Sequence, residues 1–202
     1  MNKILILAIL IGTSITSAFS QSTDSTSSKS KDTSIYFNGV KVDGKITQFV
    51  EKLKLKGFTV SKTITNGYVM SGKFLGKPIE LYVFSTPTSK LVTHVDAYFP
   101  KQTEWYTIKN EYETLKEKVT GIYGNPYEDF AFFSSPYYEG DGYEESAVKI
   151  GKCVFSSYWS NSNFWSIAVT IEDYMQVSIS YENSKNMEIR KKEALKLEEG
   201  QL

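Results

Sequence analysis

Two stretches of the chain place apolar residues at helical spacing. Between residues 45 and 56 the apolar side chains recur at separations of three, four and seven: Ile46, Phe49, Val50 and Leu53. Such spacing puts them on one face of a helix. Asp43 is a candidate N-cap for this helix, and Gly57 fits the left-handed position that follows a helix end.

The second stretch is longer and predicts a helix over residues 104–123. Its apolar stripe follows the same three-and-four rhythm: Trp105, Ile108, Tyr112, Leu115, Val119 and Ile122. Thr103 is a candidate cap at its start. Pro126 disfavours helix before it, so the helix should stop near Gly124.

Strand patterns fill most of the remaining sequence. Runs rich in β-branched and aromatic residues, separated by turn residues such as Asn66-Gly67, predict strands over residues 58–64, 68–74, 79–84, 91–99, 128–133, 147–159, 164–171 and 175–181. The fold class is therefore α+β, with two helix-plus-about-four-strand units whose helices pack on antiparallel sheet. The units, a possible tandem repeat, would lie side by side or form one continuous curved sheet with both helices on its concave face.

The first twenty residues have a different pattern. Lys3 precedes an unbroken apolar run over residues 4–11, and small residues follow at 18–20. This order predicts a signal peptide, residues 1–20, cleaved near Ser20. We expect a chain exported to the periplasm or beyond, with no lipid anchor because no cysteine lies near the cut, and with no stable membrane insertion of the mature chain.

Composition sets the remaining boundaries. Residues 21–34 lack apolar side chains and predict a disordered polar leader. An α+β domain should span 35–183, with possible halves at 35–100 and 101–183. A charged C-terminal helix or tail should occupy 184–202, with Glu188 and Lys192 as an i,i+4 pair.

Charge and cysteine usage exclude several classes of protein. Loss of Lys3 with the signal peptide leaves 22 basic and 23 acidic residues, which gives no basic surface for nucleic acid. Cys153 is the only cysteine, so the chain cannot form an internal disulfide; we expect a buried, unreactive thiol.

No standard catalytic motif is present, and we predict no catalytic residue, no metal site and no cofactor. His94 is the only histidine, so a Ser-His-Asp arrangement or a zinc site would depend on it. The alternation of its strand places it with Asp96 on the solvent face, which favours an ordinary surface histidine. Trp159 and Trp165 flank a turn, where cross-strand packing explains them better than an exposed binding tip.

One segment departs from the β rhythm. Pro136, Gly140 and Gly142 predict a long loop over residues 134–145, and long loops in compact domains are often functional. Tyrosines and acids alternate on it, and the candidate ligand-binding residues are Tyr137, Tyr138, Glu139, Asp141, Tyr143 and Glu144. Tyrosine suits contacts because it offers a large area and a polar tip.

Three interpretations of this loop compete. It is a solvated hairpin whose tyrosines fold back on the sheet edge, a recognition loop for a protein or glycan, or a carboxylate site for calcium or acid/base chemistry in which Glu145 would also take part. The spacing does not match an EF-hand, and four acids on a glycine-rich loop do not by themselves form a glycosidase pair.

The helix-plus-four-strand order resembles the β-lactamase-inhibitor-protein-like domains and the related small outer-membrane lipoproteins of the SmpA/OmlA type. The resemblance covers about residues 35–181 and includes the phrases Asp43-Gly44-Lys45-Ile46 and Tyr123-Gly124-Asn125-Pro126. It implies a tandem α+β fold and a general binding role, and no individual functional residue. The chain departs from both families, since it has neither the inhibitors' disulfides nor the lipoproteins' lipidated cysteine.

The leading functional hypothesis is an exported, non-enzymatic protein that binds an unknown protein or glycan through the loop. One alternative is a hydrolase of cell-surface polymers that uses the loop carboxylates. Another is a structural component of the cell envelope.

Overall fold

The structure of the chain is a computed structural model that describes residues 33–200. The predicted signal peptide and all but the last two residues of the predicted leader lie outside the described residues.

Ten strands and four helices make up the described part of the chain. The strands are β1 (Tyr36–Phe37), β2 (Val40–Lys41), β3 (Thr59–Ile64), β4 (Gly67–Phe74), β5 (Lys77–Ser85), β6 (Val92–Tyr98), β7 (Glu128–Phe133), β8 (Cys153–Asn161), β9 (Trp165–Glu172) and β10 (Gln176–Asn183). The helices are α1 (Ile46–Lys54), α2 (Trp105–Tyr123), α3 (Glu144–Lys149) and α4 (Ser184–Glu199). The α+β class is confirmed.

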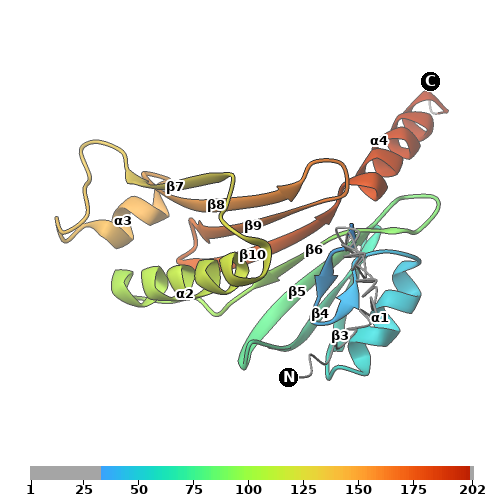
Figure 1. Ribbon diagram of the computed structural model, residues 1–202, viewed down its shortest axis with the longest axis horizontal. Coiled ribbons are helices and arrows are strands. Elements are labelled where there is room, and N and C mark those ends of the chain that lie inside the picture. Colours follow the sequence, from blue (N-terminus) through green and yellow to red (C-terminus); the bar gives the residue numbers. More distant parts are fainter. Residues whose placement is uncertain (1–32, 201–202) are drawn as a thin grey trace, which may run out of the picture. The chain divides into compact units, whose positions relative to one another are not determined.

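A single antiparallel sheet of eight strands forms the centre of the fold, in the order β3-β4-β5-β6-β10-β9-β8-β7 (Figure 1). The first predicted half supplies α1 and four of these strands, and the second supplies α2, α3 and the other four. The last strand of each half, β6 or β10, meets the other at the middle of the sheet. One continuous sheet is therefore present rather than two separate ones. The tandem repeat stays a prediction, because a similar element order does not establish a repeated sequence.

One face of the sheet is covered by α1 and α2 (Figure 1). Cross-strand register brings Leu81, Ala97, Ile179 and Val169 side by side on this face, and all four are buried. The predicted helix stripes pack against them, with Leu53 of α1 fully buried, except that Ile122, predicted on the α2 stripe, is 75 % exposed. Truncation of a leucine at such a site costs about 2–5 kcal/mol.

The opposite face carries polar and aromatic side chains. A row across β6, β10, β9, β8 and β7 joins Tyr98, Ser178, Thr170, Ser156 and Phe130. Small hydroxyl residues thus occupy the middle of this face and aromatic residues lie on both sides of them.

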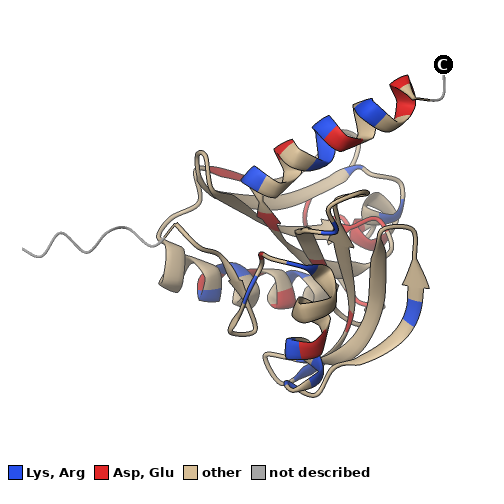
Figure 2. Cartoon of the chain, turned by 90° about the vertical axis from the view of Figure 1, so that its right-hand side faces the viewer, with Lys and Arg blue, Asp and Glu red and all other residues tan. Residues whose placement is uncertain are grey.

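Helix α4 follows β10 directly and is attached at its first turns. The Asn183 side chain accepts a hydrogen bond from the Asn186 backbone N–H at 3.1 Å, and the Asn186 amide donates to the Val92 carbonyl at 2.7 Å. Further along, Glu193 accepts from the Thr88 N–H at 2.8 Å. Residues 195–199 of α4 are exposed, and the helix carries both signs of charge along its length (Figure 2).

Several local predictions need correction. The helix α3 and a turn at Gly151 (φ +68°) replace the first part of the strand predicted over residues 147–159. The consecutive residues Ala147 and Val148 are both buried, which a helix allows on one side and a strand with one buried face does not. The ion pair of α4 joins Glu188 to Lys191, at 2.9 Å, and not to Lys192.

Neither predicted N-cap performs that function. The first N–H of α1, from Ile46, donates to the Lys90 carbonyl at 2.9 Å, whereas Asp43 accepts hydrogen bonds from Gly44 and Asn186. Thr103 does not cap α2, whose first N–H, from Trp105, donates to the carboxylate of Glu145. Gly57 does have the predicted positive φ, +87°.

Candidate functional site

The predicted loop connects β7 to α3. The β7–β8 ladder ends at Phe133 opposite Cys153, and the chain then leaves the sheet until α3 begins at Glu144. Gly140 and Gly142 adopt φ of +90° and +78°, a region that side chains other than glycine disfavour. The loop is therefore residues 134–143, two residues shorter than predicted.

Two acidic side chains fold the loop upon itself. Asp141 accepts hydrogen bonds from the backbone N–H groups of Tyr138, at 3.0 Å, and Tyr143, at 2.7 Å. Glu144 is buried and accepts from the Gly140 N–H at 2.7 Å. These bonds satisfy backbone donors that regular secondary structure would otherwise pair.

Two more carboxylates attach the loop region to α2. Glu145 accepts a hydrogen bond at 2.8 Å from the backbone N–H of Trp105, the first residue of the helix. A carboxylate at this position satisfies an orphan donor and interacts favourably with the positive end of the helix dipole. Glu139 forms an ion pair with Lys109, one turn further along. All four acids of the loop region therefore stabilise the conformation of the loop or its attachment to α2.

The three loop tyrosines divide into one structural residue and two exposed ones. Tyr137 packs against the hydrophobic core. Tyr138 and Tyr143 are each 64 % exposed, and Tyr106, in the first turn of α2, is 80 % exposed. The interpretation that the tyrosines fold back onto the protein is thus right for Tyr137 and wrong for Tyr138 and Tyr143.

Loop and helix enclose a hollow of about 480 Å³. Its lining residues are Trp105, Tyr106, Lys109, Asn110, Glu113, Glu139, Gly140 and Glu144. Pockets for small ligands commonly have volumes of about 300–1,000 Å³. The hollow combines aromatic surface with an amide, carboxylates and an ammonium group. It therefore contains both donors and acceptors of hydrogen bonds.

The sequence prediction found the loop half of this site and missed the helix half. Tyr106, Lys109, Asn110 and Glu113 follow one another at helical spacing on the side of α2 that lacks the apolar stripe. That pattern is present in the sequence, but it is also typical of any solvated helix face. Only the structure places the loop beside it.

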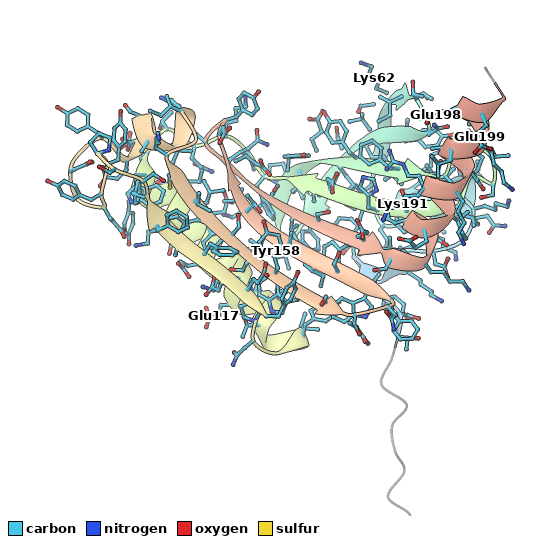
Figure 3. The ribbon with its side chains drawn as sticks, turned by 90° about the horizontal axis from the view of Figure 1, so that it is seen from above. Lys62, Glu117, Tyr158, Lys191, Glu198 and Glu199 are labelled. Carbon is cyan, nitrogen blue, oxygen red and sulfur yellow. The ribbon has the colours of Figure 1, made fainter. Side chains whose placement is uncertain are left out.

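The sheet face opposite α1 and α2, part of which lies beside α4, is a second surface that the sequence prediction did not identify. Aromatic pairs form on it, with Tyr82 against Tyr98 at 5.5 Å and Phe130 against Tyr158 at 6.3 Å between ring centroids. Figure 3 shows this face, with Tyr158 labelled near its middle. Alternation within each strand indicates the face, but cross-strand register determines which rings meet.

His94 lies on that face, as the alternation predicts, yet it is largely covered. Its ring stacks on Phe84 with centroids 4.4 Å apart, and only 17 % of the side chain is exposed. Burial lowers the pKa of His94, and the nearby carboxylate of Asp96 opposes this shift while Arg190 of α4 adds to it. The prediction of an ordinary surface histidine is therefore wrong.

The other singled-out residues belong to the core. Cys153 is buried, and burial raises the pKa of its thiol to about 12. Trp159 and Trp165 are buried too, and Trp159 donates its ring N–H to the Gly124 carbonyl at 2.8 Å. The packing interpretation of both tryptophans is confirmed.

No group of three or more histidine, cysteine, aspartate or glutamate side chains among residues 33–200 could hold a metal ion. None of the helices in the same range combines the length and the apolar character that crossing a bilayer requires. Comparison with protein-family models, curated proteins and solved structures finds no match for this chain.

Proposed function

We propose that the chain is an exported binding protein that recognises a protein or a glycan at the hollow between the loop and α2. Tyr106 lines the hollow, and the exposed Tyr138 and Tyr143 lie on the loop that supplies Glu139 and Gly140 to it; the three tyrosines would supply most of the contact area. The observation that carries the proposal is their exposure on backbone that buried or hydrogen-bonded carboxylates hold in place. Export rests on the pattern of residues 1–20.

Preorganisation supports this function. A free loop must lose conformational entropy on binding, whereas a loop that is already ordered does not, so the same contacts yield a higher affinity. Asp141 and Glu144 bind three backbone N–H groups within the loop, and Glu145 attaches the following helix to α2.

The chemistry of the hollow supports a polar ligand with flat apolar surfaces. Tyrosine rings stack on such surfaces and their hydroxyl groups form hydrogen bonds, and Asn110 and Glu113 add further polar groups. Sugar rings and peptide segments both have this character.

The hydrolase alternative has less support. General acid/base chemistry requires carboxylates that are free to exchange protons with a substrate. Glu139, Asp141, Glu144 and Glu145 instead accept hydrogen bonds from a lysine or from backbone N–H groups of the protein itself.

A matched pair of variants tests the proposal. The first combines Tyr106→Ser, Tyr138→Ser and Tyr143→Ser; Tyr137 is left unchanged because it packs on the core. The control is Tyr174→Ser, which alters an exposed tyrosine in the turn between β9 and β10. Both are compared with the unmodified chain on an array of cell-envelope oligosaccharides and against immobilised envelope proteins.

We expect the triple variant to lose about 100-fold or more in affinity for whichever ligand the unmodified chain binds, since exposed aromatic anchors dominate such interfaces. The control should bind normally. Melting temperatures should stay within about 2 °C, because surface substitutions rarely change stability by more than about 0.5 kcal/mol. Undiminished binding by the triple variant contradicts the proposed site.

A further inference from the structure

The two edge strands of the sheet differ in how they are protected against pairing with another strand. An edge exposes unpaired N–H and C=O groups, and natural proteins usually block it with lysine, proline or a bulge. The β3 edge has a register irregularity between Val60 and Lys62, and Lys62 lies on it (Figure 3). The β7 edge has neither device, since Glu128–Phe133 contains no lysine or proline and pairs with β8 in continuous register.

The hydrogen-bonding groups of β7 alternate in direction. Ser134 lies opposite Lys152 in the continued β7–β8 register, and its N–H donates to the Lys152 carbonyl at 2.7 Å. The even-numbered residues of β7 therefore bond to β8, and the odd-numbered residues direct their N–H and C=O groups away from the sheet. The outward residues are Asp129, Ala131 and Phe133.

The side chains at this edge are unusually apolar for an exposed strand. Phe130 and Phe132 are 40 % and 48 % exposed, and Ala131 between them is exposed as well. Both phenylalanines belong to the sheet face opposite α1 and α2, where Phe130 already contacts Tyr158 of the neighbouring strand. A partner strand would extend this aromatic surface.

We propose that β7 pairs with β7 of a second copy of this chain, in an antiparallel ladder whose two-fold axis passes through Ala131. In this register each outward residue lies opposite another outward residue: Ala131 faces its own copy, and Asp129 faces Phe133 of the second copy. All three can then donate and accept ladder hydrogen bonds. The contact is isologous and closes on itself, as most homodimer contacts do.

The side chains fit the same register. A two-fold axis normal to the sheet keeps each face on its own side, so Phe130 of one copy lies directly opposite Phe132 of the other, and the reverse pair repeats the contact. Aromatic cross-strand pairs stabilise sheets. Glu128 and Asp129 lie at one end of β7, so the antiparallel arrangement places the acids of the two copies at opposite ends of the ladder. A second copy therefore matches this edge in hydrogen-bond register and in cross-strand side-chain pairing and keeps the acids apart, independently of the function proposed above.

Proline at the centre of the ladder tests the proposal. Ala131→Pro removes an N–H that the monomer does not use, and proline is tolerated at the edge of a sheet. Thr63→Pro is the matched control on β3, since Thr63 lies next to the Ile64–Gly67 pair that closes the β3–β4 turn and so directs its N–H outward as well.

Sedimentation equilibrium of the chain from residue 21 is run to about 1 mM, because a small interface forms a weak complex. We expect a monomer–dimer equilibrium that Ala131→Pro weakens about 30-fold, the loss that corresponds to two ordinary hydrogen bonds. Thr63→Pro should leave it unchanged. A monomer at every concentration, or a dimer that Ala131→Pro leaves unaffected, overturns the proposal.

Two further variants keep the proposal falsifiable if Ala131→Pro does not fold. A variant with Phe130→Lys and Phe132→Lys and a second variant with Phe130→Glu and Phe132→Glu should each fail to self-associate, and mixing the two should restore a dimer. Ala131→Cys should form a disulfide between copies under oxidation, because a hydrogen-bonded pair has a Cα separation of about 5.5 Å, within the disulfide range. Thr63→Cys is the control. No restored dimer on mixing, or crosslinking equal to that control, overturns the proposal.

Discussion

The carboxylate of Glu145 is the most informative single group in the site, because it caps a helix that is forty residues away in sequence. Its oxygen accepts from the Trp105 N–H at 2.8 Å, and Glu145 also lies in the first turn of α3. We predict that Glu145→Ala lowers the free energy of unfolding by about 1–2 kcal/mol, the usual loss on removing an N-cap. For a domain of this size that corresponds to a fall of about 3–6 °C in melting temperature.

The assay combines thermal unfolding with amide hydrogen exchange. Glu145→Ala should accelerate exchange in the first turn of α2 and across residues 138–143, because the loop loses its attachment to the helix. Glu145→Gln retains an acceptor without the charge and should give a smaller effect. The control is Glu117→Ala, an exposed acid further along α2 (Figure 3). If Glu145→Ala and Glu117→Ala unfold at the same temperature with equal exchange in the loop, the capping role is refuted.

Three other predictions concern titratable groups. Burial raises the pKa of Tyr98 and Tyr112 to about 12, from an ordinary 10.0, so the unfolded chain releases these protons first and the free energy of unfolding should fall as pH rises from about 10 to 12; Tyr112→Phe with Tyr98→Phe should flatten this decline in denaturant titrations. The pKa of His94 is lowered below 6.5, so its destabilising effect should appear as pH falls below 6.5, and His94→Gln should reduce the loss of stability there. The Cys153 thiol, with its pKa raised to about 12, should react with a thiol reagent only after unfolding, and rapid labelling of the native protein would contradict its burial.

The elements that depend on local pattern could be predicted from the sequence. The stripe of α2 predicts its extent to within one residue, because burial of one helix face imposes a period that the sequence must follow. β7 also has the predicted bounds; nearly all of its residues are exposed, and its aromatic residues are typical of a strand. The loop could be located as well, since Pro136, Gly140 and Gly142 interrupt the strand pattern.

The contacts that give the site its form could not be predicted. A carboxylate has the same sequence signature whether it faces solvent or accepts a hydrogen bond, so nothing in the sequence shows that Glu145, rather than another acid, accepts the Trp105 N–H. The covering of His94 has the same origin, because alternation assigns a residue to a face but does not show that a later helix, with Arg190, lies near it. Both outcomes depend on pairing between segments far apart in the chain.

Chemical-shift mapping can show directly whether ligands bind at the hollow between the loop and α2. An isotope-labelled chain is titrated with the oligosaccharide or protein that the binding screen selects. We expect the largest changes in amide chemical shift in residues 105–113 and 138–145. Shifts confined to the opposite sheet face around Tyr98 and Tyr158, with residues 105–113 and 138–145 unperturbed, would contradict the proposed binding site.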